Sequence, residues 1–113
     1  MIILTPPKEQ IDELFEILYK EDIDQILEEC RNMYFMKKKW RRKCILKGLR
    51  TIMELKEYQY LSDPEKVDVV LAFYEIDPEL FMSSIYPEMK VWNFPAFLKI
   101  KDDLFEKLLK DEH

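Results

Sequence analysis

The most distinctive chemistry in the sequence lies between Phe35 and Arg50, in the stretch FMKKKWRRKCILKGLR. It carries eight lysine or arginine residues and no acidic residue. Clustered ammonium and guanidinium groups attract the phosphates of nucleic acids and the carboxylates of acidic proteins. The candidate binding residues are these cations and the tryptophan among them: Lys37, Lys38, Lys39, Trp40, Arg41, Arg42, Lys43, Lys47 and Arg50.

The charge of this region is opposite to that of the rest of the chain. Residues 31–50 carry a formal charge of +9, the remaining residues carry −14, and the net charge is −5. A positive patch on a negative body is typical of a protein that attracts an acidic partner. We therefore expect the basic stretch to bind another protein through that protein's acidic surface.

A second set of residues is a candidate for the same interface. Residues 86–96, YPEMKVWNFPA, contain two prolines and three aromatic residues. Aromatic side chains are enriched in interface cores, and they also fill the cores of small proteins. Tyr86, Trp92 and Phe94 are therefore candidates either for a secondary interface or for the protein's own core.

Two other interpretations of the basic stretch remain open. The same helix would contact phosphates in a nucleic-acid-binding protein, with Trp40 stacking on bases, although the sequence pI of about 5.0 is low for such a module. Alternatively, the cations pair with the protein's own acidic helices, where exposed pairs contribute only about 0–1 kcal/mol each. The acidic body argues against a membrane surface as the partner.

The inventory of residues excludes most catalytic sites. The only histidine is His113, the cysteines are Cys30 and Cys44, and the only glycine is Gly48. Catalytic triads, zinc sites and glycine-rich phosphate loops need more of these residues than the chain contains. The clustered carboxylates, as at residues 22–29 and 102–106, are typical of solvated helix faces. We therefore expect no enzymatic activity, no metal and no cofactor.

Apolar residues recur at helical spacing along most of the chain, and a single glycine leaves few tight hairpins. The pattern predicts helices near 6–20, 22–35, 36–61 and 63–75, a short helix that starts near residue 77 and ends before Pro87, and a last helix from about 93 to 111. Residues 86–96 are expected to form a connector. A short extended piece within this connector, paired with Ile2–Leu4, is a minor alternative.

These elements predict a compact all-α domain spanning residues 1–113. We expect five to six mostly short helices in bundle-like or orthogonal packing. No run of about 20 apolar residues is present to span a bilayer, and no signal peptide is evident, which predicts a cytoplasmic protein with reduced thiols. The predicted function is that of a non-enzymatic regulator, adaptor, inhibitor or small subunit of a larger assembly.

Overall fold

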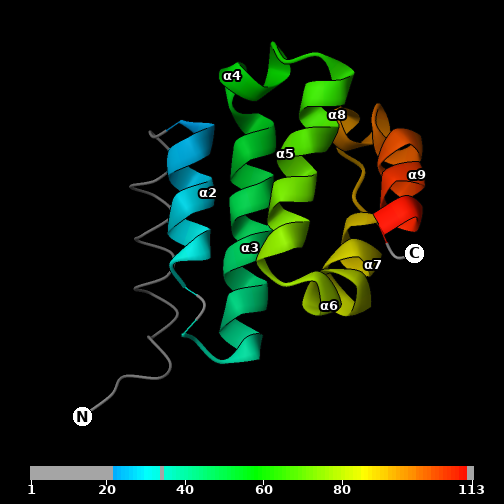
Figure 1. Ribbon diagram of the computed structural model, residues 1–113. Helices are drawn as coiled ribbons and strands as arrows, with labels where there is room; N and C mark the ends of the chain where they lie inside the picture. Colours follow the sequence, from blue (N-terminus) through cyan, green and yellow to red (C-terminus); the bar gives the residue numbers. More distant parts are fainter. Residues whose placement is uncertain (1–21, 34, 112–113) are drawn as a thin grey trace.

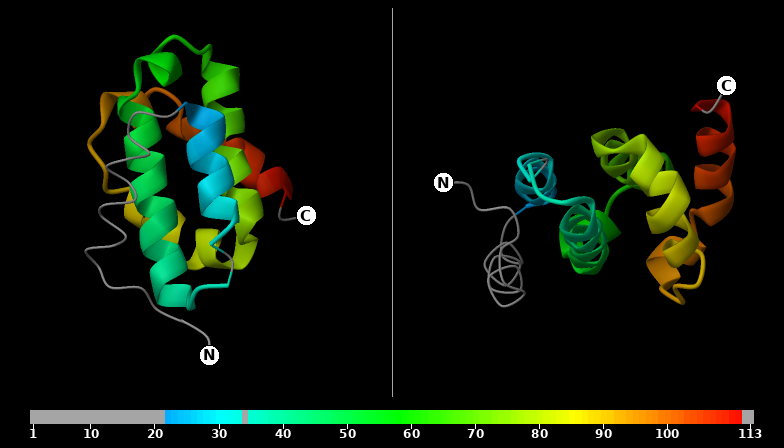
Figure 2. Two further views of the ribbon diagram at one scale, coloured as in Figure 1. Left: turned by 90° about the vertical axis from the view of Figure 1, so that its left-hand side faces the viewer. Right: turned by 90° about the horizontal axis from the view of Figure 1, so that it is seen from below.

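Three helices that run side by side form the centre of the fold (Figure 1). The computed structural model describes residues 22–33 and 35–111. In it, α3 (Lys38–Glu54) runs antiparallel to both α2 (Ile23–Arg31) and α5 (Asp63–Ile76). Helix α2 packs against α3 and α5, and α9 (Lys101–Asp111) packs on α5 (Figure 2). No strand occurs among the described residues, and the predicted compact all-α fold is confirmed.

A single cluster of buried apolar side chains joins these helices. Its largest fully buried members are aromatic, and they come from four different helices: Tyr58, Phe73, Phe81 and Phe97. The apolar positions of α2 and α3 lie in the same cluster, as their helical spacing predicts. Burial of these large rings supplies much of the favourable free energy of folding.

The starts of α2 and α5 are stabilised by side-chain caps. The Asp22 side chain caps α2 by accepting a hydrogen bond from the backbone of Gln25 at 2.9 Å. Ser62 and Glu65 form a capping box at the start of α5. The Ser62 backbone N–H and hydroxyl both donate to the Glu65 carboxylate, which lowers the pKa of Glu65.

The predicted helix from 36 to 61 is wrong in its length. Helix α3 ends at Glu54, Leu55 is extended with ψ of 142°, and a separate short helix α4 follows at Lys56–Gln59. The break redirects the chain so that Tyr58 enters the core with no exposed surface. The preceding helix is also shorter than predicted, because α2 ends at Arg31 and Asn32 forms its C-terminal cap.

The prediction that a helix ends before Pro87 is wrong as well. A continuous helical run passes through that residue: α6 (Pro78–Leu80), the π-helical segment η1 (Phe81–Ile85) and α7 (Tyr86–Met89). Proline has no N–H to donate and its ring collides with the preceding turn of a regular α-helix. In η1 the Tyr86 N–H donates to the Phe81 carbonyl five residues earlier. We attribute the tolerance of Pro87 to this wider turn.

The last predicted helix is divided in two. A short helix α8 (Pro95–Leu98) is followed by a turn at residues 99–100, and α9 begins at Lys101. Ile100 in the turn is completely buried, so the break directs one more side chain into the core. The connector of residues 86–96 contains helix α7 and no strand. The predicted helix at 6–20 and the extended piece at Ile2–Leu4 lie outside the described residues.

Candidate functional site

The basic residues of α3 lie on two different sides of the helix. Residues three or four positions apart share a face of an α-helix. Lys38, Arg41 and Arg42 lie on the side that faces the α6–α7 run. Lys39, Lys43, Lys47 and Arg50 follow one another at four- and three-residue spacing on the opposite side, away from the buried positions such as Cys44 and Ile52.

The first group is paired within the protein. The pairs are Lys38 with Glu79 at 4.0 Å, Arg41 with Asp77 at 3.1 Å and Arg42 with Glu88 at 3.3 Å. Arg41 also donates to the Met36 carbonyl at 2.7 Å, and Arg42 donates to the Ser84 hydroxyl. The interpretation that the cations pair with the protein's own acids therefore describes these three residues. The carboxylates come from the α6–α7 run and its N-terminal cap, Asp77.

The second group forms a surface that we call the α3 ridge: Lys39, Trp40, Lys43, Lys47 and Arg50. Lys39, Lys47 and Arg50 are exposed, and Trp40 and Lys43 are partly buried. The amines of Lys39 and Lys43 lie 5.7 and 5.1 Å from the centre of the Trp40 ring. Within residues 22–33 and 35–111, no carboxylate lies within ion-pair distance of Lys39, Lys43 or Arg50. These cations therefore keep their charge available for another molecule. Lys37, just before α3, is also exposed.

One end of the α3 ridge meets two of the candidate aromatic residues. The Arg50 guanidinium lies 5.5 Å from the Trp92 ring centre and 5.2 Å from that of Phe94. Both rings are partly buried and pack against the core. Tyr86, by contrast, is only 7% exposed and stacks on Phe81 with ring centres 6.3 Å apart. The structure thus brings Trp92 and Phe94 to the basic surface and places Tyr86 in the core.

The N-terminus of α3 carries charges that oppose helix stability. Its first turn has no acidic residue, and its cap, Lys37, makes no side-chain capping bond. The partial positive charge at a helix N-terminus disfavours nearby cations by about 0.3–1 kcal/mol each. Lys39 is exposed at this end without a described carboxylate to offset the cost. Residues that disfavour the local structure in this way often lie at functional sites, where they contact another molecule.

The two thiols, Cys30 and Cys44, are free and buried, and they do not supply a nucleophile. Burial raises the pKa of Cys44 above its ordinary range, to about 11. The pKa of Cys30 is raised still further by burial first, and then by the charges of Cys44 and Glu29. A reactive cysteine needs an accessible thiolate at neutral pH, which neither residue provides.

This burial predicts a loss of stability at alkaline pH. An unfolded thiol ionises near pH 8.5, so the neutral, buried Cys44 favours folding most fully below that pH. As pH rises from about 8.5 towards 10, the free energy of unfolding should fall by up to about 1.4 kcal/mol per pH unit for each thiol. Urea unfolding at pH 7.5, 8.5, 9.5 and 10 measures the slope. The Cys44→Ala variant should show a shallower slope, and an unchanged slope would contradict the assignment.

Two other kinds of site were sought among the described residues. No group of three or more histidine, cysteine, aspartate or glutamate residues there is placed to hold a metal ion. None of the described helices is both long and apolar enough to cross a membrane.

Comparison with known proteins assigns neither a family nor a function to the chain. The chain matches no family model, and no curated protein or solved structure is significantly similar to it. The function must therefore be inferred from the α3 ridge and its surroundings.

Proposed function

We propose that the protein is a non-enzymatic binding protein that docks on an acidic surface of another protein through the α3 ridge. Such a protein acts as a regulator, an adaptor, an inhibitor or a small subunit of a larger assembly. The observation that carries the proposal is the position of Lys39, Lys43 and Arg50 on one side of α3, with no described carboxylate paired to them.

The composition of the α3 ridge also supports protein docking. Tryptophan and arginine are the residues most often found in the energetic centres of protein interfaces. Trp40 lies within the ridge, and Arg50 stacks on Trp92 and Phe94 at its end. Lysines along the ridge would speed association with an acidic partner and fix its orientation. The partner we expect presents several carboxylates around an apolar or aromatic contact.

Nucleic-acid binding is the alternative, and the lysines beside Trp40 are the observation that favours it. A ring flanked by two cations resembles the stacking platforms of proteins that bind single strands. Against it, Lys38, Arg41 and Arg42 are engaged by carboxylates of the protein itself. The four cations of the α3 ridge would give duplex DNA a salt slope of roughly −4 in log affinity against log salt.

The decisive experiment compares two charge-reversed variants. The ridge variant carries Lys39→Glu, Lys43→Glu and Lys47→Glu. The matched control carries Lys101→Glu, Lys107→Glu and Lys110→Glu on α9, where all three lysines are exposed, so both variants gain the same negative charge. Each tagged protein is used to capture partners from a lysate of the source cells, and the affinity of the captured partner is then measured with purified components.

We expect the ridge variant to bind the partner at least tenfold more weakly, and the control to bind within about twofold of the wild type. Thermal unfolding should show that the ridge variant still folds cooperatively, and its removal of Lys39 from the first turn of α3 takes away one charge that disfavours the helix. Equal loss in both variants would overturn the proposal, because it would reflect net charge alone. Binding to labelled DNA or RNA that weakens from 50 to 200 mM salt, with a slope of about −4 for double strands or about −3 for single strands, would replace it with the alternative.

A further inference from the structure

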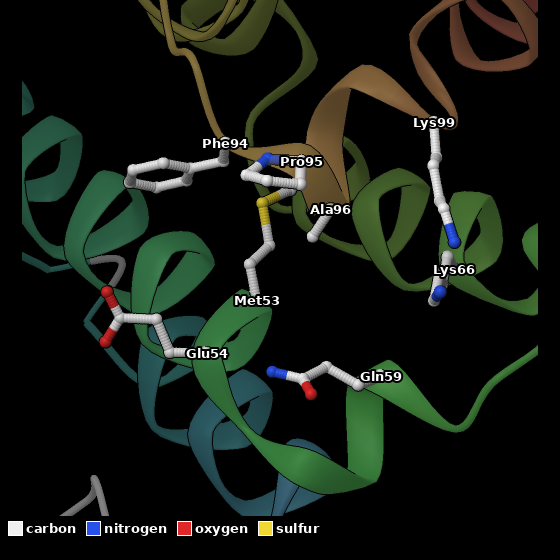
Figure 3. Close-up of a pocket in the computed structure, with 8 residues that line it drawn as sticks. All are labelled: Met53, Glu54, Gln59, Lys66, Phe94, Pro95, Ala96 and Lys99. Carbon is white, nitrogen blue, oxygen red and sulfur yellow. The ribbon is translucent and has the colours of Figure 1, made fainter.

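A pocket at the far end of α3 is separate from the basic face of the ridge. It has a volume of about 550 Å³, within the roughly 300–1,000 Å³ range of sites for small molecules. It lies where the end of α3, the short helix α4, the first half of α5 and the start of α8 meet (Figure 3). Met53, Phe94, Pro95 and Ala96 supply its apolar wall, and Glu54, Gln59, Lys66 and Lys99 supply its polar groups.

Lys66 is the unusual residue of this pocket. It is only 6% exposed, although lysine is rarely buried without a partner. The Lys66 amine lies 5.8 Å from the centre of the Tyr58 ring. Among the described residues this amine makes no hydrogen bond or ion pair, whereas the Lys66 carbonyl accepts a hydrogen bond from the Tyr58 hydroxyl. No side-chain nitrogen or oxygen among the described residues is both fully buried and unpartnered, so the Lys66 amine reaches the water of the pocket at the end of a buried stem. An anion bound there would lie beside an unpaired ammonium group in a partly desolvated setting, where opposite charges attract more strongly than in bulk water.

A second lysine, Lys99, adds positive charge to the side of the pocket that Lys66 lines. Figure 3 shows Lys66 and Lys99 at one side of the pocket and Phe94 and Glu54 at the other. The lining carries two ammonium groups and one carboxylate, so an anion is preferred over a cation. The apolar wall formed by Met53, Phe94 and Ala96 suits a hydrocarbon body.

From these features we infer that the pocket binds a small carboxylate with an apolar body, its carboxylate at Lys66 and Lys99. The hydrocarbon part lies against Met53 and Phe94. Bare inorganic anions would leave the apolar wall in contact with water, and apolar amines would bring a second positive charge to Lys66. This site does not depend on the proposed docking of a protein on the α3 ridge.

The test uses three simple probes on the full chain. Octanoate combines a carboxylate with an apolar body, acetate lacks the body, and octylammonium reverses the charge. Binding is followed by changes in backbone amide chemical shifts by NMR. We expect octanoate to bind with saturable shifts at residues of the pocket, and acetate and octylammonium to bind at least tenfold more weakly. Equal binding of all three probes, or no binding of octanoate at millimolar concentration, would overturn the inference.

A pair of variants tests the role of the buried lysine. Lys66→Met keeps the length of the side chain and removes its charge, and it should weaken octanoate binding at least tenfold without lowering thermal stability. Lys107→Met on α9, an exposed lysine away from the pocket, is the control and should bind octanoate as the wild type does. Should Lys66→Met fail to fold, the exposed Lys99→Met takes its place, with a smaller loss expected. Unchanged octanoate affinity in the lysine variant would overturn the assignment.

Discussion

Replacing Phe81 by alanine is expected to lower the free energy of unfolding by about 3–5 kcal/mol, the range for large aromatic residues in cores. The Phe81 side chain is completely buried at the start of η1. It meets Tyr74 edge to face at 5.6 Å between ring centres and stacks on Tyr86 at 6.3 Å. The substitution therefore removes two aromatic contacts and leaves a cavity between α5 and the π-helical segment. Urea unfolding followed by circular dichroism measures the loss.

Two further variants separate burial from helix propensity at this position. Phe81→Leu keeps most of the apolar volume and should cost clearly less than Phe81→Ala, about 1–2 kcal/mol. Phe105→Ala removes a ring that is 48% exposed on α9 and should cost less than about 1 kcal/mol. If Phe81→Ala and Phe105→Ala cost the same, Phe81 would not hold the place in the core that the structure gives it.

The sequence predicted most helix starts because their signals are local. Ser62 with Glu65, and Asp77 before Pro78, lie within four residues of the helix that they cap. The π-helical segment had no such signal, and Pro87 pointed to a helix end. Whether a proline ends a helix depends on the width of the preceding turn, which packing of Phe81 and Ile85 into the core decides. The break at Leu55 is also decided by packing, because it turns the chain so that the Tyr58 side chain is buried in the core.

The sequence also predicted the cations of the candidate site, but not their division into two groups. Lys38 and Lys39 are neighbours of the same type, and only one of them faces a carboxylate. The carboxylates of Asp77, Glu79 and Glu88 lie some 36 to 46 positions further along the chain, as the bond from Arg41 to Asp77 and that from Arg42 to Glu88 illustrate. Only the packing of α3 against the α6–α7 run brings them together.

Lys66 was missed, although the sequence contains a signal that would have found it. It precedes Val70 and Phe73 by four and seven residues, which places it on the buried stripe of α5. A lysine on a buried stripe indicates either a long side chain that reaches solvent or a site for an anion. The sequence could not distinguish these two cases, because the other walls of the pocket come from α3, α4 and the start of α8.

The α3 ridge and the pocket adjoin each other at Phe94. Phe94 carries the Arg50 guanidinium on its ring and also lines the pocket. The end of α3 contributes to both, with Arg50 on the ridge and Met53 and Glu54 at the pocket. The two proposed sites therefore depend on the same support, which is the packing of α3 against its neighbours. A close approach in that packing occurs at Gly48.

Gly48→Ala is expected to destabilise the protein by about 2 kcal/mol, although alanine is the better helix former. Gly48 lies inside α3, where alanine would normally gain about 1 kcal/mol. A methyl group there would lie 2.8 Å from the Cys30 sulfur and 3.3 Å from Cε1 of Phe73. Both neighbours are fully enclosed, so we place the cost of overpacking at the upper end of its range, about 3 kcal/mol.

A double-mutant cycle with Cys30→Ala identifies the clash as the cause. Cys30→Ala alone removes the sulfur and its long hydrogen bond to the Cys44 carbonyl, which should cost about 1 kcal/mol. Combined with Gly48→Ala, it vacates the space that the new methyl group needs. The double variant should therefore be more stable than the sum of the single losses predicts, with a coupling of about 1–2 kcal/mol. Strictly additive losses, or a stabilising Gly48→Ala, would show that α2 and α3 do not meet at this glycine.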